Sequence, residues 1–178
     1  GWAEQWPKPW EDATYATIKM AVEQSGVDPK EIAGACISAL YGGSGIPVDR
    51  EYKPIRPCLI WADRRAIEEC RWVGNKIGEE ALFNVTGNII DPYYGYTKMI
   101  WIRENEPEKW AKIHRFETPN AYVIRQLTGV ESIDYSSAGN YGGIFDLAKR
   151  DWSHEMMEEL SIPAHFFPQK IHSSEEIV

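Results

Sequence analysis

The chain has 178 residues, of which 43% are hydrophobic and 26% charged, values typical of a globular domain with a substantial core. Its formal net charge of −8 argues against a nucleic-acid or anionic-membrane surface, and no apolar run approaches the ~20 residues that would span a bilayer. No basic segment followed by an apolar one marks a signal peptide. The cysteines, Cys36, Cys58 and Cys70, share no metal-ligand spacing, which predicts buried free thiols in a reducing cytoplasm.

The first third of the chain is predicted to contain one long helix and three short strands. Apolar residues recur at helical spacing over 10–25, and Gly26 ends that helix. Asp28 caps a short helical turn in which Pro29 takes the first position. The strands are predicted at 33–40, 46–49 and 58–61. Because they are close in sequence, we expect the first strands to be antiparallel neighbours.

The remaining two thirds are predicted to form a block of helices and two further strands. Helices are expected over 63–77, 79–84, 97–104, 107–113, 118–127 and 156–160, and strands over 133–137 and 143–147. This order of elements predicts a mixed α/β fold. The sequence starts at Gly1 without a methionine and ends in a polar stretch, so we expect it to be a piece of a longer chain.

The segment 56–66 is the most informative part of the sequence. A short apolar strand ends in the indole of Trp61, the carboxylate of Asp63 and the guanidinium of Arg64. These groups suit a polyhydroxylated ligand, because an aromatic face covers C–H surface while a carboxylate and an Arg fork bind hydroxyl groups. The alternative is a core tryptophan followed by a helix that Asp63 caps. Arg65 is expected to point outward into solvent.

Six short motifs occur in the order found in one known family. They are Gly1–Gln5, Trp61–Arg65, Thr86–Tyr93, Thr97–Trp101, Asp134–Ala138 and Arg150–Ser153. In this order the sequence resembles the FGGY carbohydrate kinases, which include glycerol kinase, xylulokinase, gluconokinase and ribulokinase. The resemblance implies an actin-like, ribonuclease-H-like α/β fold with a mixed sheet flanked by helices.

The resemblance also implies what this chain contributes to such a kinase. Residues 1–178 correspond to part of the N-terminal, sugar-binding domain, without its first strands and without the C-terminal nucleotide domain. ATP and Mg²⁺ are therefore expected in the full-length protein and not on this chain alone. The catalytic base of the family is expected beyond Val178, so no catalytic residue is assigned here.

Candidate substrate contacts follow from the same resemblance. Trp61 and Tyr93 match tryptophan and tyrosine residues that contact substrate in glycerol kinase, and Asp63 and Arg64 belong to the Trp61 motif. A departure from the family occurs at Tyr41, Gly42 and Gly43, where xylulokinases carry a Met-His pair and glycerol kinases an Arg-Glu pair. We expect Tyr41 and the backbone of the two glycines to contact the sugar instead.

Lys98 lies just after the Tyr93 segment, and a solvated helix face is its expected position, with a cleft or structural role as the alternative. The function implied is ATP-dependent phosphorylation of a sugar or polyol, with a small-molecule partner, no nucleic acid, no membrane, and a homodimer left open. Two alternatives remain. One is a non-catalytic sugar-binding or regulatory module. The other is a glycosidase, which would need two carboxylates about 5–9.5 Å apart.

Overall fold

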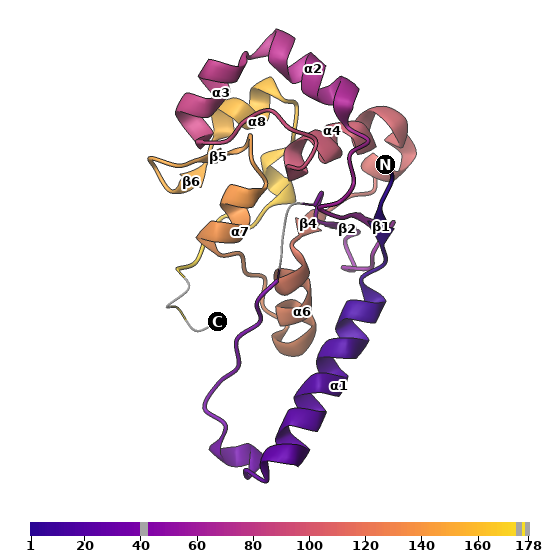
Figure 1. The fold of residues 1–178 in the computed structure, drawn as a ribbon, viewed down its shortest axis with the longest axis vertical. Coiled ribbons are helices and arrows are strands. Elements are labelled where there is room, and N and C mark those ends of the chain that lie inside the picture. Colours follow the sequence, from indigo (N-terminus) through magenta and orange to yellow (C-terminus); the bar gives the residue numbers. More distant parts are fainter. Residues whose placement is uncertain (40–42, 174–175, 177–178) are drawn as a thin grey trace.

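The computed structural model describes residues 1–39, 43–173 and 176 (Figure 1). Its helices are α1 Lys8–Ser25, α2 Ile67–Lys76, α3 Glu79–Thr86, α4 Gly95–Asn105, α5 Pro107–Trp110, α6 Pro119–Thr128, α7 Tyr135–Asn140 and α8 His154–Glu159, with short 3₁₀ turns at Pro29–Glu31 and Ala164–Phe166. Its strands are β1 Glu4–Gln5, β2 Ile46–Val48, β3 Cys58–Leu59, β4 Arg115–Glu117, β5 Phe145–Asp146 and β6 Asp151–Trp152.

The strands of the described residues pair in three two-stranded antiparallel sheets, β1 with β3, β2 with β4, and β5 with β6. The prediction that the first strands neighbour one another is therefore wrong. β2 pairs instead with β4, placing Val48 opposite Arg115, and β3 pairs with the N-terminal β1. Both partners are too short to show period-2 alternation, so sequence patterning did not find them.

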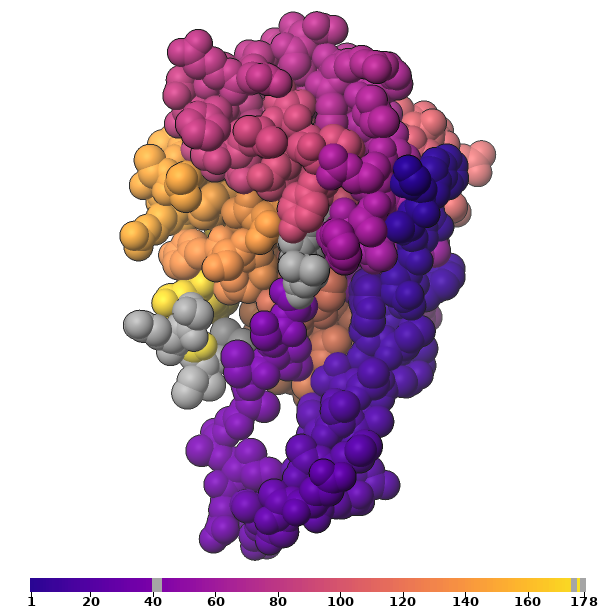
Figure 2. Space-filling model, in the orientation of Figure 1, coloured from indigo at the N-terminus to yellow at the C-terminus, as the bar shows by residue number. Residues whose placement is uncertain are grey.

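The predicted strand at 33–40 is also wrong over its described part. Residues 33–39 have no regular structure, and all except the half-buried Ile37 are exposed. A strand needs a neighbouring backbone to satisfy its amides and carbonyls, and no described segment pairs with this one. In Figure 2 this segment stands away from α1 over part of its length. Leu40 lies outside the described residues.

Helix ends were predicted more successfully than strands. α1 ends at Gly26, Asp28 accepts a hydrogen bond from the Lys30 amide, and the Thr118 side chain caps α6. The strand predicted at 133–137 is wrong, because Asp134 accepts a hydrogen bond from the Ser137 amide and begins α7.

None of the helices in the described part of the chain is both long and apolar enough to cross a membrane.

Two apolar clusters hold the elements together. The larger one lies among α2, α3, α4, α7 and α8, and Tyr96, Met99 and Tyr141 are fully buried within it. The smaller one joins β2 and β3 to α6 through Ile46, Val48, Cys58, Tyr122 and Val123. No residue of α1 is buried, so this helix lies on the surface of the smaller cluster. The candidate site borders that smaller cluster.

Gly142 allows α7 to pack closely against the start of α4. Its φ is +89°, and a Cβ there would lie 2.8 Å from the Tyr94 Cβ and 2.9 Å from the Tyr96 ring. We expect Gly142→Ala to lower the free energy of unfolding by about 3 kcal/mol, because a strained backbone and overpacking both add to the cost. Urea denaturation of the 178-residue chain measures this.

Gly129→Ala is the control, because Gly129 has a left-handed backbone with a φ of +77° but nothing within 4 Å of its Cβ position. Backbone strain alone should cost about 1 kcal/mol there. Equal losses in the two variants would contradict the close-packing account.

Candidate functional site

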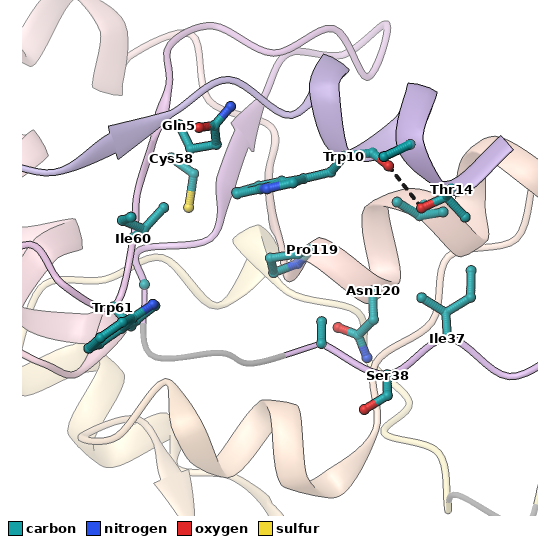
Figure 3. A pocket seen from close by; sticks show the side chains of 14 residues that line it. Gln5, Trp10, Thr14, Ile37, Ser38, Cys58, Ile60, Trp61, Pro119 and Asn120 are labelled. Carbon is teal, nitrogen blue, oxygen red and sulfur yellow. Dashed lines mark hydrogen bonds between the residues drawn. The ribbon is translucent and has the colours of Figure 1, made fainter. Parts of the chain in front are cut away.

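A cavity of about 460 Å³ opens between α1, β3 and the start of α6. Figure 3 shows the Trp10 indole reaching from α1 toward Cys58 and Ile60, with Trp61 at one side and Asn120 at the other. Its lining is mainly apolar and aromatic, with a few amide and hydroxyl groups, which is the usual composition of a small-molecule pocket. None of the described residues that line it is Asp, Glu, Lys, Arg or His.

Trp61 stands directly after β3 and remains 49% exposed. The strand ends at Leu59, and a turn follows in which the Asp63 amide donates to the Ile60 carbonyl at 2.9 Å. This turn brings the indole to the cavity wall. A core position, the alternative considered from the sequence, does not describe an indole that is half exposed.

Asp63 is fully buried, and its hydrogen bonds stabilise the turn that carries Trp61. Its carboxylate accepts hydrogen bonds from the Ala3 amide at 2.6 Å, the Arg65 amide at 3.0 Å and the Arg65 guanidinium at 2.7 Å. Burial opposes ionisation, but these hydrogen bonds outweigh it, so the pKa of Asp63 lies below its usual range. Asp63 is not a cap of α2, whose first turn begins after Ala66 without a side-chain cap.

Arg65 was expected to point into solvent, and that expectation is wrong. Its side chain is 1% exposed, and its guanidinium lies 3.9 Å from the centre of the Trp2 ring and 4.7 Å from that of Trp101. It also pairs with Glu4 at 2.9 Å. Because its partners come from distant parts of the chain, no local pattern marks this residue as buried. Together with Asp63 it fastens the N-terminal segment to the Trp61 turn.

Arg64 connects the Trp61 turn to the loop that carries Tyr93. Its guanidinium reaches both oxygens of Asp91, at 2.9 and 3.0 Å, and Asp91 accepts the Tyr93 amide at 2.7 Å. Tyr93 is half-buried, and its ring packs edge-on against Tyr94. Of the predicted contacts, Asp63, Arg64 and Tyr93 do not line the cavity themselves, whereas Trp61 does.

The predicted glycine segment is only partly described, because Tyr41 and Gly42 lie outside the described residues. Gly43 is buried and lines the cavity. A Cβ at Gly43 would clash with the Leu59 carbonyl oxygen and lie 3.3 Å from the Cys58 Sγ. The segment therefore runs against the end of β3, where the Ser44 amide donates to Leu59 at 2.9 Å. This close approach is one use of a glycine backbone.

Several residues near the site escaped the sequence analysis. Trp10 was assigned only to a helical face, and Asn120 only to a helix start, although both line the cavity. Lys98 was expected on a solvated face, and that is wrong because its side chain is fully buried. The positions of these three side chains depend on contacts between segments that are distant in the sequence. The local sequence pattern does not indicate those contacts.

The cysteines differ in their surroundings. Cys58 is buried in the cavity wall, and burial raises the pKa of its thiol to about 12, so it is a neutral group there. Cys70 is half-buried, and Cys36 is exposed, which contradicts the prediction of buried thiols for that residue. In the described part of the chain no three His, Cys, Asp or Glu residues gather in a way that could hold a metal ion.

The sequence matches the N-terminal domain of the FGGY family of carbohydrate kinases over residues 1–178. The chain belongs to this family. It is 30% identical to a glycerol kinase from Thermococcus gammatolerans, over 98% of this chain and 36% of that protein. It is 28% identical to a xylulose kinase from Lactococcus lactis, over 98% of this chain and 34% of that protein.

Solved FGGY kinase structures agree with the fold. A xylulose kinase from Brucella ovis superposes with a TM-score of 0.87 at 26% identity, covering 96% of this chain and 35% of that one. The fold is therefore the actin-like α/β fold of these kinases. The chain spans about a third of the length of the relatives it matches.

Replacing Asp63 by Asn should lower the free energy of unfolding by about 3 kcal/mol at pH 7, because the buried Arg65 charge would keep its pair with Glu4 but lose the buried carboxylate of Asp63. A carboxylate whose pKa is lowered in the folded state stabilises the fold at pH values above its ordinary pKa. This stabilisation is lost as the pH falls through the pKa of the folded state. The difference between wild type and Asp63→Asn should therefore shrink in acid. Urea denaturation of the 178-residue chain across this pH range measures it.

Asp12→Asn is the control, since Asp12 forms a surface pair with Lys8 on α1 and its side chain is 59% exposed. Its loss should cost less than about 1 kcal/mol. A difference for Asp63→Asn that stays constant with pH would contradict the role of its ionised form.

Proposed function

We propose that residues 1–178 form the sugar-binding side of an enzyme that transfers a phosphoryl group from ATP to a hydroxyl of a sugar or polyol. The observation that supports this most directly is the half-exposed Trp61 indole on the cavity wall. An indole face covers the C–H surface of a sugar, and the buried Asp63–Arg65 pair fixes the turn that presents it. Family membership supplies the reaction class.

The remaining contacts are proposed around this face. Gly43 brings backbone to the cavity wall. We propose that Tyr41 and Gly42 also contact the sugar. Arg64 places the Tyr93 loop against the Trp61 turn through Asp91. Tyr93 would then contribute a second aromatic surface with a hydroxyl group. In this arrangement Asp63 fixes the turn that carries Trp61 and does not contact the sugar.

The division of labour follows from the chemistry of phosphoryl transfer, which depends on positioning and charge stabilisation. A base must reach the attacking hydroxyl, and the described cavity wall offers no carboxylate or imidazole. We propose that this chain binds and orients the sugar, and that the base, ATP and Mg²⁺ are held elsewhere in a full-length cytoplasmic protein. Bound Mg²⁺ and ATP would supply the phosphoryl group and its charge neutralisation.

The neutral cavity wall predicts a preference among substrates. In the full-length protein, glycerol, xylulose and ribulose should be phosphorylated with higher kcat/KM than gluconate, because burying a carboxylate without a cation is unfavourable. An ADP-release assay over this panel measures the ranking. Gluconate as the best substrate would contradict the assignment of this cavity, and no activity with any sugar or polyol would favour a non-catalytic binding module.

Trp61→Ala and Tyr93→Ala should each lower kcat/KM for the preferred sugar about 30-fold, which corresponds to about 2 kcal/mol of lost aromatic contact, with KM for ATP unchanged. Trp72→Ala is the matched control, because Trp72 is 38% exposed on α2 and its ring lies against Lys76 and Arg103, which belong to neither the Trp61 turn nor the Tyr93 loop. Initial-rate kinetics on the full-length protein distinguish them. Unchanged kinetics in both site variants would rule out the proposed contacts.

The 178-residue chain alone should show no thermal shift with Mg-ATP, since we propose that the nucleotide and its metal ion are held by the rest of the full-length protein. Differential scanning fluorimetry with and without Mg-ATP measures this. A clear increase in Tm that EDTA abolishes would show that the nucleotide site had been misplaced.

A further inference from the structure

Helix α4 buries a lysine. The side chain of Lys98 has no exposed surface, in a helix whose residues 95–100 are all buried. A buried ammonium loses its hydration, and a well-packed apolar side chain of similar size would often be as stable or more stable at such a place. Stability of the fold therefore does not account for this lysine. Buried ionisable groups beside a cleft are candidates for a functional role.

The ammonium of Lys98 reaches one residue of the candidate site in two ways. It donates a hydrogen bond to the Tyr93 carbonyl oxygen at 2.6 Å, and it lies 5.7 Å from the centre of the Tyr93 ring. The amide of the same residue is held from the other side by Asp91 at 2.7 Å. The backbone of Tyr93 is thus fixed at both its amide and its carbonyl group, each by a charged partner.

The charge of Lys98 also interacts with charged groups of the segment that carries Trp61. The charged groups that act on it are Asp63 and Arg64 from the turn after β3 and Asp91 from the Tyr93 loop, together with the neutral thiol of Cys58 in β3. Burial lowers the pKa of Lys98 to about 8, so it is still mainly a cation at pH 7. Lys98 therefore lies where the Trp61 turn and the Tyr93 loop meet.

We propose that Lys98 is a positioning residue of the sugar site, which holds the Tyr93 loop against the Trp61 turn and so sets the place of the Tyr93 ring. This inference rests on the proposed function. Lys98 acts through Tyr93, so its removal should misplace that ring without touching the nucleotide side. The effect should appear in sugar binding and not in the folding of the chain.

The test is kinetics of Lys98→Met in the full-length protein at pH 7, with the best substrate of the panel. KM for the sugar should rise roughly tenfold or more, with KM for ATP unchanged and Tm equal to or above that of wild type. Lys98→Arg, which keeps the charge and the donor, should recover part of the loss. Lys112→Met, at an exposed lysine after α5, is the control and should change neither KM nor Tm.

A double-mutant cycle with Tyr93→Ala tests the route of the effect. If Lys98 acts through Tyr93, Lys98→Met should change KM for the sugar by less than about twofold in the Tyr93→Ala background. A full effect in that background would overturn the proposal. So would an unchanged KM in Lys98→Met, or a lower Tm accompanied only by a lower kcat, which would indicate a structural role.

The activity of the wild-type protein distinguishes a failure of the proposed function from a failure of this inference. A wild-type protein that phosphorylates no sugar or polyol would overturn the proposed function, and this inference with it. An active wild type whose KM for the sugar is unaffected by Lys98→Met would overturn this inference alone.

Discussion

The arrangement of the candidate site depends on one buried ion pair, that between Asp63 and Arg65. β1 and β3 are each two residues long, so their ladder alone provides few hydrogen bonds to hold the N-terminal segment against the Trp61 turn. Asp63 adds a bond to the Ala3 amide, and Arg65 adds an ion pair to Glu4. Burying these charges is costly, and the fold tolerates it because the carboxylate is fully hydrogen-bonded and the guanidinium packs against two indoles.

The same physical principle recurs as the site extends away from this pair. Arg64 contacts both carboxylate oxygens of Asp91, and Lys98 donates a hydrogen bond to the Tyr93 carbonyl oxygen. Arg64, Asp91 and Tyr93 lie in loops, and loops without ladders are usually the less stable parts of a protein. Directional charged hydrogen bonds restrict them to one geometry, which apolar packing alone specifies less sharply. The two aromatic candidates, Trp61 and Tyr93, are thus held by charges that do not line the cavity.

Sequence reasoning succeeded where the determining contacts lie within a few residues. The Asp28 turn and the Thr118 cap involve partners two or three positions away. It failed where the partner is distant: Arg65 meets Glu4 across 61 positions, and the segment 33–39 shows an apolar strand pattern but no neighbouring strand among the described residues. The helix at 135–140 is a different case, because the capping pattern of Asp134 and Ser137 was present in the sequence although a strand was predicted over the same residues. The family motifs placed Trp61 at the cavity, but they could not show that Arg65 is buried.

The separation of neutral and charged groups explains what this part of the molecule is suited to do. The cavity wall presents indoles, amides, hydroxyl groups and a thiol whose pKa is raised to about 12, all of which are uncharged at neutral pH. Such a wall can bind an uncharged polyol through C–H contact and hydrogen bonds without paying for the desolvation of an ion. The charged side chains of Asp63, Arg65 and Lys98 are buried and do not line the cavity, and burial makes each of their hydrogen bonds stronger. They can therefore fix the geometry of the wall, and in the proposed division of labour the charges of phosphoryl transfer are stabilised by groups outside this cavity.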